Sequence, residues 1–453
     1  MAVKGIPEFI SEATLGQIPP AGIHGAKRNL LDTIGVILAG CHEEVTRLAV
    51  EALGKHPSAS GSPVIGYPLD AEPCTAALLN GVAAHALDYD DSSETMFGHP
   101  SGEVVSALLA LASGLPVSGA EFLLAYAVGV EVEAKMSLAM PDHYDWGWHN
   151  TSTLGSIGAA AGCARLLGLP RESATMAVGI ASSLASGVKQ NFGTMTKPLH
   201  MGNAARNGVI AALLAKNGFT ADEQAVGGPQ GFAKVYSGSG SYDMKATLES
   251  LGNPWEVADP GLRIKLYPCC TSNHRPVEAA VLLSNEHKID PAEIERVDCG
   301  VIYKVPDILI RSDPSSGVEA KFCLQYCVAR ALTSGRLSIS HFDLEQVLDP
   351  SLRPLMKRVF MYVHPEGRKE TMTRQLAEVT IKMRDGRVFT RKVYEQEGHP
   401  LRPLSDEQVR NKFMDCATRV LRKGQAQGLM NYLWDIESKP GVQPVLDILS
   451  GRQ

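Results

Sequence analysis

The 453-residue sequence contains no run of about 18 consecutive apolar residues, so we expect no membrane-spanning helix. It also lacks an excess of basic residues. Its 43 Lys and Arg stand against 49 Asp and Glu, and the formal charge of −6 argues against a nucleic-acid partner. Aromatic residues make up only 6% of the chain, whereas glycine occurs 43 times. We therefore expect a core of small residues in close backbone contact.

Cysteine pairs with metal-ligand spacing are also missing. The nine cysteines include no repeated CxxC, and the sequence has no P-loop, no GxSxG elbow and no GxGxxG after a strand. Only a site made of His and Asp could hold a metal. The odd number of cysteines and the absence of a secretory pattern in the first residues predict free thiols and a cytoplasmic location.

The length, about three times the ~150 residues of a typical domain, predicts two or three domains. Residues 1 to about 260 are expected to form one helix after another, because apolar residues recur there at helical spacing between Gly and Pro breaks. The segments with this spacing are 29–40, 74–85, 105–112, 121–132, 155–167, 172–186 and 203–214.

The pattern changes after Pro260. Residues 295–305 alternate like a strand, and two further alternating runs, 377–383 and 387–393, flank Asp385-Gly386, which is typical of a β-hairpin. Helical patterns at 275–286 and 319–333 lie between these strands. Ser405 and Gln408 form a capping box, and the residues that follow, to 451, are expected to be helical and can rejoin the first helices.

Four polar segments could carry chemistry. The densest contains His85 and Asp88 on one helix face, followed by acidic residues and by His99-Pro100, which opens a helix whose N-terminal amides could hold an anion. The alternative is helix capping beside a solvated acidic loop. The second segment places His149 in a Gly/Trp turn, and a buried structural histidine is the alternative there.

The third segment places Lys197 in a Gly/Thr-rich loop before a helix, which suits carboxylate or phosphate binding, although an ordinary surface lysine would fit too. The fourth contains Cys269-Cys270 and His274. Adjacent cysteines are poorly placed to share a zinc ion, so inert buried thiols are expected.

Together, AHALDYDDS…GHPSG, GWHNTSTLG, NFGTMTKPLHMGNAARNG and KLYPCCTSNH resemble the MmgE/PrpD family over essentially the whole chain. This family includes 2-methylcitrate dehydratases, cis-aconitate decarboxylases and an iminodisuccinate epimerase. The resemblance implies a mainly α fold, with a large all-helical domain from residues 1–264 and 401–453 and a smaller α+β lid domain from residues 265–400. It also implies a homodimer whose site, between the domains, uses no metal and no other cofactor.

The resemblance also assigns site residues. The implied catalytic residues are Asp88, His99, His149 and Lys197, and the implied substrate-binding residues are Ser92, His274, Arg206 and Arg275. The decarboxylases have Thr in place of Ser92, one residue fewer before His99, and a His where Cys270 stands. These departures count against cis-aconitate decarboxylation, and the DYDDS…GHPS and GWH forms look more like the epimerase branch.

The family reactions share a proton transfer at a carbon next to a carboxylate, which requires a base of near-neutral pKa and cations to hold the carboxylates. His149 and His99 suit the acid and base roles, Asp88 could fix a histidine tautomer, and Lys197 could bind substrate. We expect a cofactor-free lyase acting on a small di- or tricarboxylate. A 2-methylcitrate or citrate-type dehydratase comes first, because hydroxy-acid turnover is the commonest assignment in the family.

The alternatives are an epimerase of an imino- or amino-dicarboxylate and a cis-aconitate decarboxylase. A non-catalytic binding protein and a His/Asp metallohydrolase are candidates of other classes.

Overall fold

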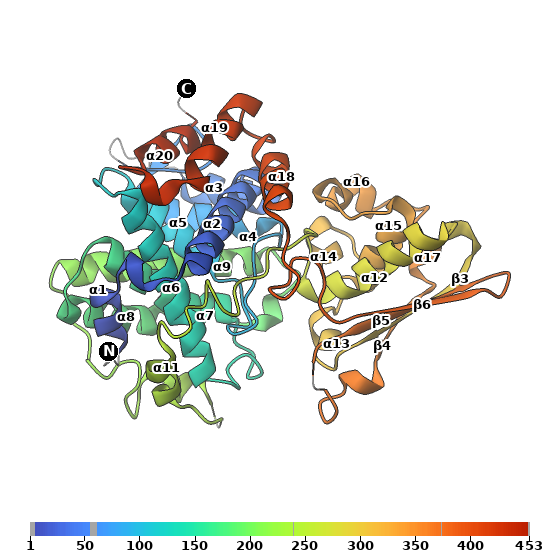
Figure 1. Ribbon diagram of the computed structural model, residues 1–453, viewed down its shortest axis with the longest axis horizontal. Helices are drawn as coiled ribbons and strands as arrows, with labels where there is room; N and C mark the ends of the chain where they lie inside the picture. Colours follow the sequence, from blue (N-terminus) through green and yellow to red (C-terminus); the bar gives the residue numbers. More distant parts are fainter. Residues whose placement is uncertain (1–4, 55–60, 239, 373, 452–453) are drawn as a thin grey trace.

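The computed structural model describes residues 5–54, 61–238, 240–372 and 374–451. Figure 1 shows a large body of helices on one side and a smaller unit with a β-sheet on the other. The predicted fold class, mainly α with a smaller α+β part, is confirmed. None of the described helices is both long and apolar enough to cross a membrane.

The helical body combines the first half of the chain with its C-terminal end, and α18–α20 return to pack beside α2 (Figure 1). Its helices are α1 (Ile6–Glu12), α2 (Pro20–Gly40), α3 (Glu44–Leu53), α4 (Pro73–Ala86), α5 (Ser101–Ala112), α6 (Gly119–Ala139), α7 (Asn150–Leu166), α8 (Arg171–Leu184), α9 (Thr196–Lys216), α10 (Phe232–Tyr236), α11 (Met244–Ser250), α18 (Asp406–Ala417), α19 (Lys423–Trp434) and α20 (Gln443–Leu449). Short 3₁₀ turns are η1 (Leu15–Gln17), η2 (Lys189–Asn191) and η6 (Ile436–Ser438).

The sheet unit lies between α11 and α18 in the sequence. Its strands follow the order β4-β3-β5-β6, with β4 parallel to β3 and the other neighbours antiparallel. The strands are β3 (Ile294–Val301), β4 (Val359–Val363), β5 (Ala377–Met383) and β6 (Val388–Val393). The helices and turns are α12 (Thr271–His287), η3 (Pro291–Glu293), α13 (Val305–Ile308), α14 (Gly317–Ala320), α15 (Leu324–Ser334), η4 (Ile339–Phe342), α16 (Leu344–Val347), α17 (Arg353–Met356) and η5 (Pro365–Gly367).

Each part has its own apolar core. One continuous cluster of buried side chains extends through the helical body up to Ile264 and resumes at Leu404, whereas a second runs from Tyr267 to Val393. α12 and α15 pack against the sheet and supply much of the second core. The predicted domain limits, 264/265 and 400/401, stay a prediction.

Most local expectations agree with the structure. All seven predicted helical segments fall on α2 and α4–α9, the Asp385-Gly386 hairpin joins β5 to β6, and the Ser405 capping box begins α18. Three differences remain. The helix expected over 319–333 is broken, because Cys323 adopts an extended conformation and its Sγ caps the new helix α15 at the Tyr326 N–H. Edge strand β4 was not expected.

The third difference lies in the helical body, which is not purely helical, since β1 (Ser62–Pro63) pairs with β2 (Asp70–Ala71).

The close contact between α4 and α9 depends on glycine. A Cβ added to Gly202 would lie 2.4 Å from the Leu78 carbonyl oxygen, and one added to Gly81 would lie 2.7 Å from the Gly202 Cα. The two helices therefore approach backbone to backbone. This contact matters for the cleft, because His85 lies in the last turn of α4 and Lys197 in the first turn of α9.

We predict that Gly202→Ala destabilises the protein by about 1–3 kcal/mol, because the methyl group forces α4 and α9 apart. A lower thermal midpoint and a lower activity are expected together. The matched control is Gly428→Ala on the exposed side of α19, where an added Cβ meets nothing within 4 Å. That variant is expected to be neutral or slightly stabilised, by up to about 1 kcal/mol. Equal midpoints for both variants would contradict the argument.

Candidate active site

The C-terminal end of α4 is held by lysines from distant parts of the chain. Asp88, two residues beyond the helix, has a φ of 50°, a left-handed conformation that non-glycine residues rarely adopt. Three buried lysines donate hydrogen bonds to the carbonyl oxygens around it: Lys321 to Ala86 at 2.9 Å, Lys265 to Asp88 at 2.8 Å and Lys412 to Tyr89 at 2.9 Å. These contacts satisfy the exposed end of the helix and compensate for the strained backbone.

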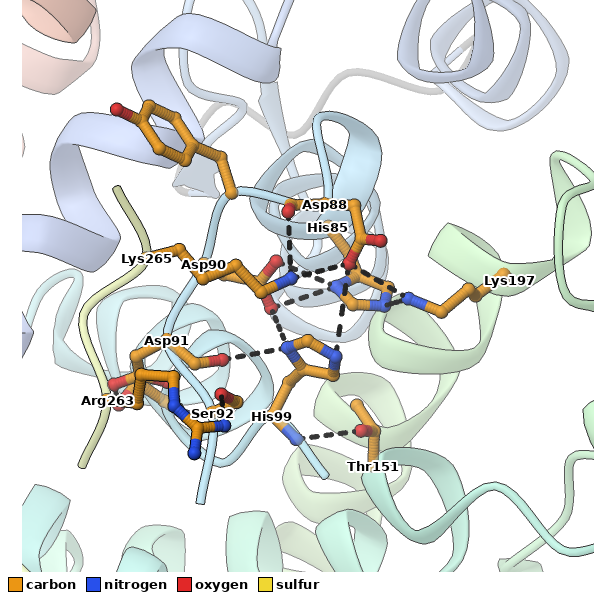
Figure 2. A network of polar contacts seen from close by, with 12 residues as sticks. His85, Asp88, Asp90, Asp91, Ser92, His99, Thr151, Lys197, Arg263 and Lys265 are labelled. Atoms are coloured by element: carbon orange, nitrogen blue, oxygen red, sulfur yellow. Dashed lines mark hydrogen bonds and ion pairs between the residues drawn. The ribbon is translucent and has the colours of Figure 1, made fainter. Parts of the chain in front are cut away.

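The Asp88 carboxylate lies between two ammonium groups. Its Oδ1 accepts hydrogen bonds from Lys265 at 2.8 Å and from Lys197 at 3.2 Å (Figure 2). Burial alone would raise the pKa of Asp88, but the two lysines and His99 hold it well below 3.8. Asp88 is therefore a permanent anion in the centre of the site.

His85 has a fixed tautomer. Its Nδ1 lies 2.8 Å and 2.9 Å from the two oxygens of Asp90, and its Nε2 lies 2.5 Å from the Lys197 Nζ (Figure 2). Asp90 can only accept when ionised, and Lys197 can only donate, so the proton is assigned to Nδ1. Burial, together with Lys197, lowers the pKa of His85 to about 3. His85 is thus a neutral link that connects Asp90 to Lys197.

The imidazole ring of His99 is oriented by a backbone carbonyl group. Its Nδ1 donates to the Asp91 carbonyl oxygen at 2.7 Å, and its own backbone N–H donates to the Thr151 hydroxyl at 2.9 Å. The Nε2 atom therefore carries the lone pair, and it lies 3.9 Å from Asp88 Oδ1. Burial lowers the pKa of His99, so this atom is a free base at neutral pH.

His149 faces a second histidine. It precedes α7, where its backbone N–H bonds the Gly187 carbonyl, and its Nδ1 lies 3.0 Å from Nδ1 of His200 on α9. One of these two nitrogens must donate, so the tautomer of His149 depends on that of His200. Burial, and next Lys197, keep the pKa of His149 well below 6.5.

Asp91 occupies the N-terminus of α5, where the sequence suggested a site for an anion. Its carboxyl group accepts from the Ser101 amide at 3.3 Å, from the Ser101 hydroxyl and from the Asn29 amide at 2.8 Å. That expectation is corrected, because these donors hold the protein's own side chain. Burial raises the pKa of Asp91 to about 7, although the hydrogen bonds from Ser101 and Asn29 oppose the shift.

Asp88, His99, His149 and Lys197 line one side of a cleft between the helical body and the sheet unit. The cleft has an empty volume of about 930 Å³, partly open to solvent, which is large enough for a small metabolite. Six of the eight predicted site residues line it: Asp88, Ser92, His99, His149, Lys197 and Arg275. Phe192 and Phe322 pack around the Lys197 ammonium, with ring centroids 5.5 Å and 5.4 Å away.

The structure does not bring the other two predicted residues to the cleft. His274 is fully buried, its Nε2 against the Cys269 carbonyl at 3.2 Å and its ring against Tyr267. Arg206 is half-buried on α9 and donates to Asn203 at 2.8 Å. The partners of His274 and Arg206 in these hydrogen bonds do not line the cleft, so we assign neither residue a role in substrate binding.

Several residues at the site were not predicted from the sequence to have a role there. His85 and Asp90 lay in the densest polar segment, and their spacing could have suggested a pair. Lys265 and Arg263 alternate around Ile264, which predicts that both point to one side of an extended segment. Arg263 pairs by its backbone with Ser92, which fixes the edge of the cleft.

A cation-binding arrangement exists at the same place. One ligand atom from each of His85, Asp88, Asp90 and His99 lies within 4.8 Å of the others. However, Nε2 of His85 and Oδ1 of Asp88 already accept hydrogen bonds from lysine ammonium groups. A metal ion would have to displace these charges, so the donor set fits the protein's own cations better.

Comparisons with known proteins cover nearly the whole chain. The MmgE/PrpD N-terminal domain matches residues 4–245, and the MmgE/PrpD C-terminal domain matches residues 267–436. The chain is 31% identical to a cis-aconitate decarboxylase of Mus musculus, over 95% of this chain and 89% of that protein. It is 30% identical to the Homo sapiens protein of that name, over 100% and 96%. A 2-methylcitrate dehydratase of Escherichia coli (strain K12) is 25% identical over 76% and 74%.

We predict a pH-dependent stability contribution from Asp91. Its pKa in the folded protein, about 7, exceeds the usual 3.8, so the folded state binds the proton more tightly. The stabilisation is complete below pH ~4 and disappears as the pH rises towards 7, with a slope of up to about 1.4 kcal/mol per pH unit. Compared with Asp91→Asn, the wild-type protein should therefore lose thermal stability between pH 5 and 7 and then level off.

The control is Asp222→Asn, at an exposed aspartate outside the cleft. Its thermal midpoint should run parallel to that of the wild type at every pH. If the difference between wild type and Asp91→Asn were constant across the range, Asp91 would be an ordinary carboxylate.

Proposed function

Since this chain belongs to the MmgE/PrpD family, we propose that it is a lyase that transfers a proton at a carbon next to a carboxylate of a small di- or tricarboxylic acid. The observation that carries the proposal is the state of His99. Its Nδ1–H is held by a backbone carbonyl, so a neutral Nε2 lies on a cleft that contains lysine and arginine. A base of this kind, beside cations, is what removal of such a proton requires.

His99 is stabilised in both of its protonation states. As the free base, His99 donates its Nδ1–H to the backbone carbonyl oxygen of Asp91. When Nε2 accepts a proton, the positive charge that forms is balanced by Asp90, 3.3 Å from Nδ1, and by Asp88, 3.9 Å from Nε2. The two carboxylates therefore favour the charged state that follows proton abstraction.

Lys197 supplies the positive charge for a substrate carboxylate. Its ammonium has three N–H donors, of which two are engaged by His85 and Asp88. Among the described residues no further hydrogen bond from this ammonium is found, so its third donor is left for a ligand in the cleft. Arg275 reaches the cleft from α12, and its orientation is set by Gln375 at 2.9 Å and by the Tyr394 carbonyl at 2.5 Å.

We propose dehydration of a 2-methylcitrate or citrate-type hydroxy acid as the reaction. His99 takes the carbon-bound proton, the electron pair forms the carbon–carbon double bond, and the carbon–oxygen bond breaks. In its protonated form, which its low pKa makes a strong acid, His149 gives a proton to the departing hydroxyl, which leaves as water. This assignment is supported by two acid–base groups on one cleft and by the relative named as a 2-methylcitrate dehydratase.

Two other reactions have support of their own. Decarboxylation is favoured by the identity to proteins named cis-aconitate decarboxylase, and epimerisation of an imino- or amino-dicarboxylate by the presence of two separate bases, His99 and His149. In an epimerase one base would remove the α-proton and the other would return it to the opposite face.

Independence from metals and other cofactors, a homodimer and a cytoplasmic location stay predictions that rest on the family resemblance and on the thiol pattern.

His149→Gln is expected to lower turnover by about 10²-fold or more, as for the loss of a general acid or base. Glutamine keeps a polar side chain of similar size against His200, so the fold should survive. The comparison is His42→Gln, at an exposed histidine remote from the cleft, which should leave turnover unchanged. Full activity in a folded His149→Gln protein would remove His149 from the mechanism.

The reaction class can be tested by product analysis in heavy water. Dehydration releases water and forms an ultraviolet-absorbing double bond conjugated to a carboxylate, which is the result we expect with a citrate-type substrate. A decarboxylase would release carbon dioxide and leave one deuterium in the product. Deuterium entering an unconsumed substrate, with neither new absorbance nor gas, would replace dehydration by epimerisation.

A further inference from the structure

Glu94 places a carboxylate on the wall of the cleft, in the loop between α4 and α5. One of its oxygens, Oε1, is surrounded by cationic or donor groups. Arg263 forms a short ion pair with it, the His399 Nε2 lies 3.2 Å away, and the Arg275 guanidinium lies 3.7 Å away. Arg263, His399 and Arg275 are each more than nine-tenths buried, so they hold Oε1 in a defined position.

The contact with His399 has a fixed direction. The Leu401 backbone N–H donates to His399 Nδ1 at 3.1 Å, so the histidine proton is assigned to Nε2, which donates to Glu94. Burial would raise the pKa of Glu94, but the His399 hydrogen bond and the Arg263 charge lower it to about 2. Glu94 is therefore ionised throughout the physiological pH range, and its carboxylate stays paired with Arg263 and His399.

The second oxygen, Oε2, has no such partner. Across the described residues, no hydrogen bond to this atom is found, and the Glu94 side chain keeps 35% of its surface exposed. An ionised oxygen on the cleft wall can only accept hydrogen bonds. Carboxylates of a bound polyacid offer no donor at neutral pH and would be repelled, whereas a hydroxyl or ammonium group would donate to it.

We propose that Glu94 is a specificity-determining residue that selects polycarboxylates carrying a hydrogen-bond donor, a hydroxyl or amino group, over those carrying only carboxylates and carbon. This inference rests on the proposed function, since it assumes a polycarboxylate in the same cleft. It separates hydroxy acids and amino acids, which satisfy Oε2, from olefinic acids, which leave it unpaired. A ligand without a donor would bury Oε2 unpaired, and a polar group that binding leaves without a partner is a strong discriminator.

The experiment compares two tricarboxylates that differ by one hydroxyl group, citrate and propane-1,2,3-tricarboxylate, by calorimetric titration of the full-length protein at pH 7. We expect wild-type protein to bind citrate at least about 10-fold more tightly. Malate and aspartate, each measured against succinate, determine whether the preferred donor is a hydroxyl or an amino group. Either preference supports the proposal.

The test variant is Glu94→Gln. Arg263 and His399 would hold its carbonyl oxygen, which turns its NH₂ group towards the cleft, so the acceptor becomes a donor. The preference for citrate should then vanish or reverse. The control is Glu295→Gln, an exposed residue on β3 paired with Lys382, which should keep the wild-type preference.

The wild-type measurement alone decides the matter if the variant fails to fold. Equal affinities for citrate and propane-1,2,3-tricarboxylate, and for the dicarboxylates with and without a donor, would overturn the role of Glu94 and leave the proposed function intact. An unchanged preference in folded Glu94→Gln would also overturn it. If no polycarboxylate in the panel bound at all, both this inference and the proposed function would fail.

Discussion

The site depends on one buried charge, the Asp88 carboxylate. It anchors Lys197 from α9 and Lys265 from the segment that joins the two cores, while Lys321 and Lys412 bind the backbone on either side of it. A carboxylate buried at this depth is tolerable only when paired, and removing one partner of such a pair typically costs about 3–5 kcal/mol. The left-handed backbone of Asp88 persists because these contacts over-determine it.

Burial, together with the Lys197 ammonium that Asp88 anchors, keeps His85 and His149 neutral. Lys197 donates to His85, which fixes the tautomer of His85 and keeps its Nδ1–H on Asp90. Asp90 in turn lies close to Nδ1 of His99, so α4, α9 and the loop before α5 share one polar network. Burial depresses the pKa of each histidine, while the neighbouring carboxylates lessen the cost of a single added proton at His99. The proposed proton transfer needs one base that is neutral at rest and stable once charged.

Much of this fold was accessible from the sequence because its signals are local. Helical spacing located α2 and α4–α9, Asp385-Gly386 located the β5–β6 hairpin, and the family resemblance, confirmed by both matched domains, pointed to the segments that form the cleft. Edge strand β4 was missed because its burial depends on a parallel partner about sixty residues earlier in the chain. Glu94 and His399 escaped notice because only the tertiary fold brings them together.

His274, which the family resemblance assigned to the site and which does not reach the cleft, shows the same limit. His274 and Arg275 are neighbours on α12, and successive residues of a helix point about 100° apart. Arg275 faces the cleft, whereas His274 turns into the core of the sheet unit beside Tyr267. Motif position identified the helix correctly, but which side chain enters the cleft was decided by how α12 packs on the sheet.

The hydrogen bond from Lys412 to the Tyr89 carbonyl, just beyond α4, has a consequence for folding during synthesis. Tyr89 and Lys412 are 323 residues apart, and Lys321 also lies far downstream of the carbonyl that it binds. A chain emerging from the ribosome folds from its N-terminal end and exposes His85, Asp88 and His99 long before these lysines are made. The backbone around Asp88 therefore acquires its full set of lysine donors only when synthesis is nearly complete. Unfinished or truncated chains contain Asp88 and the histidines without the lysines that hold the backbone around Asp88.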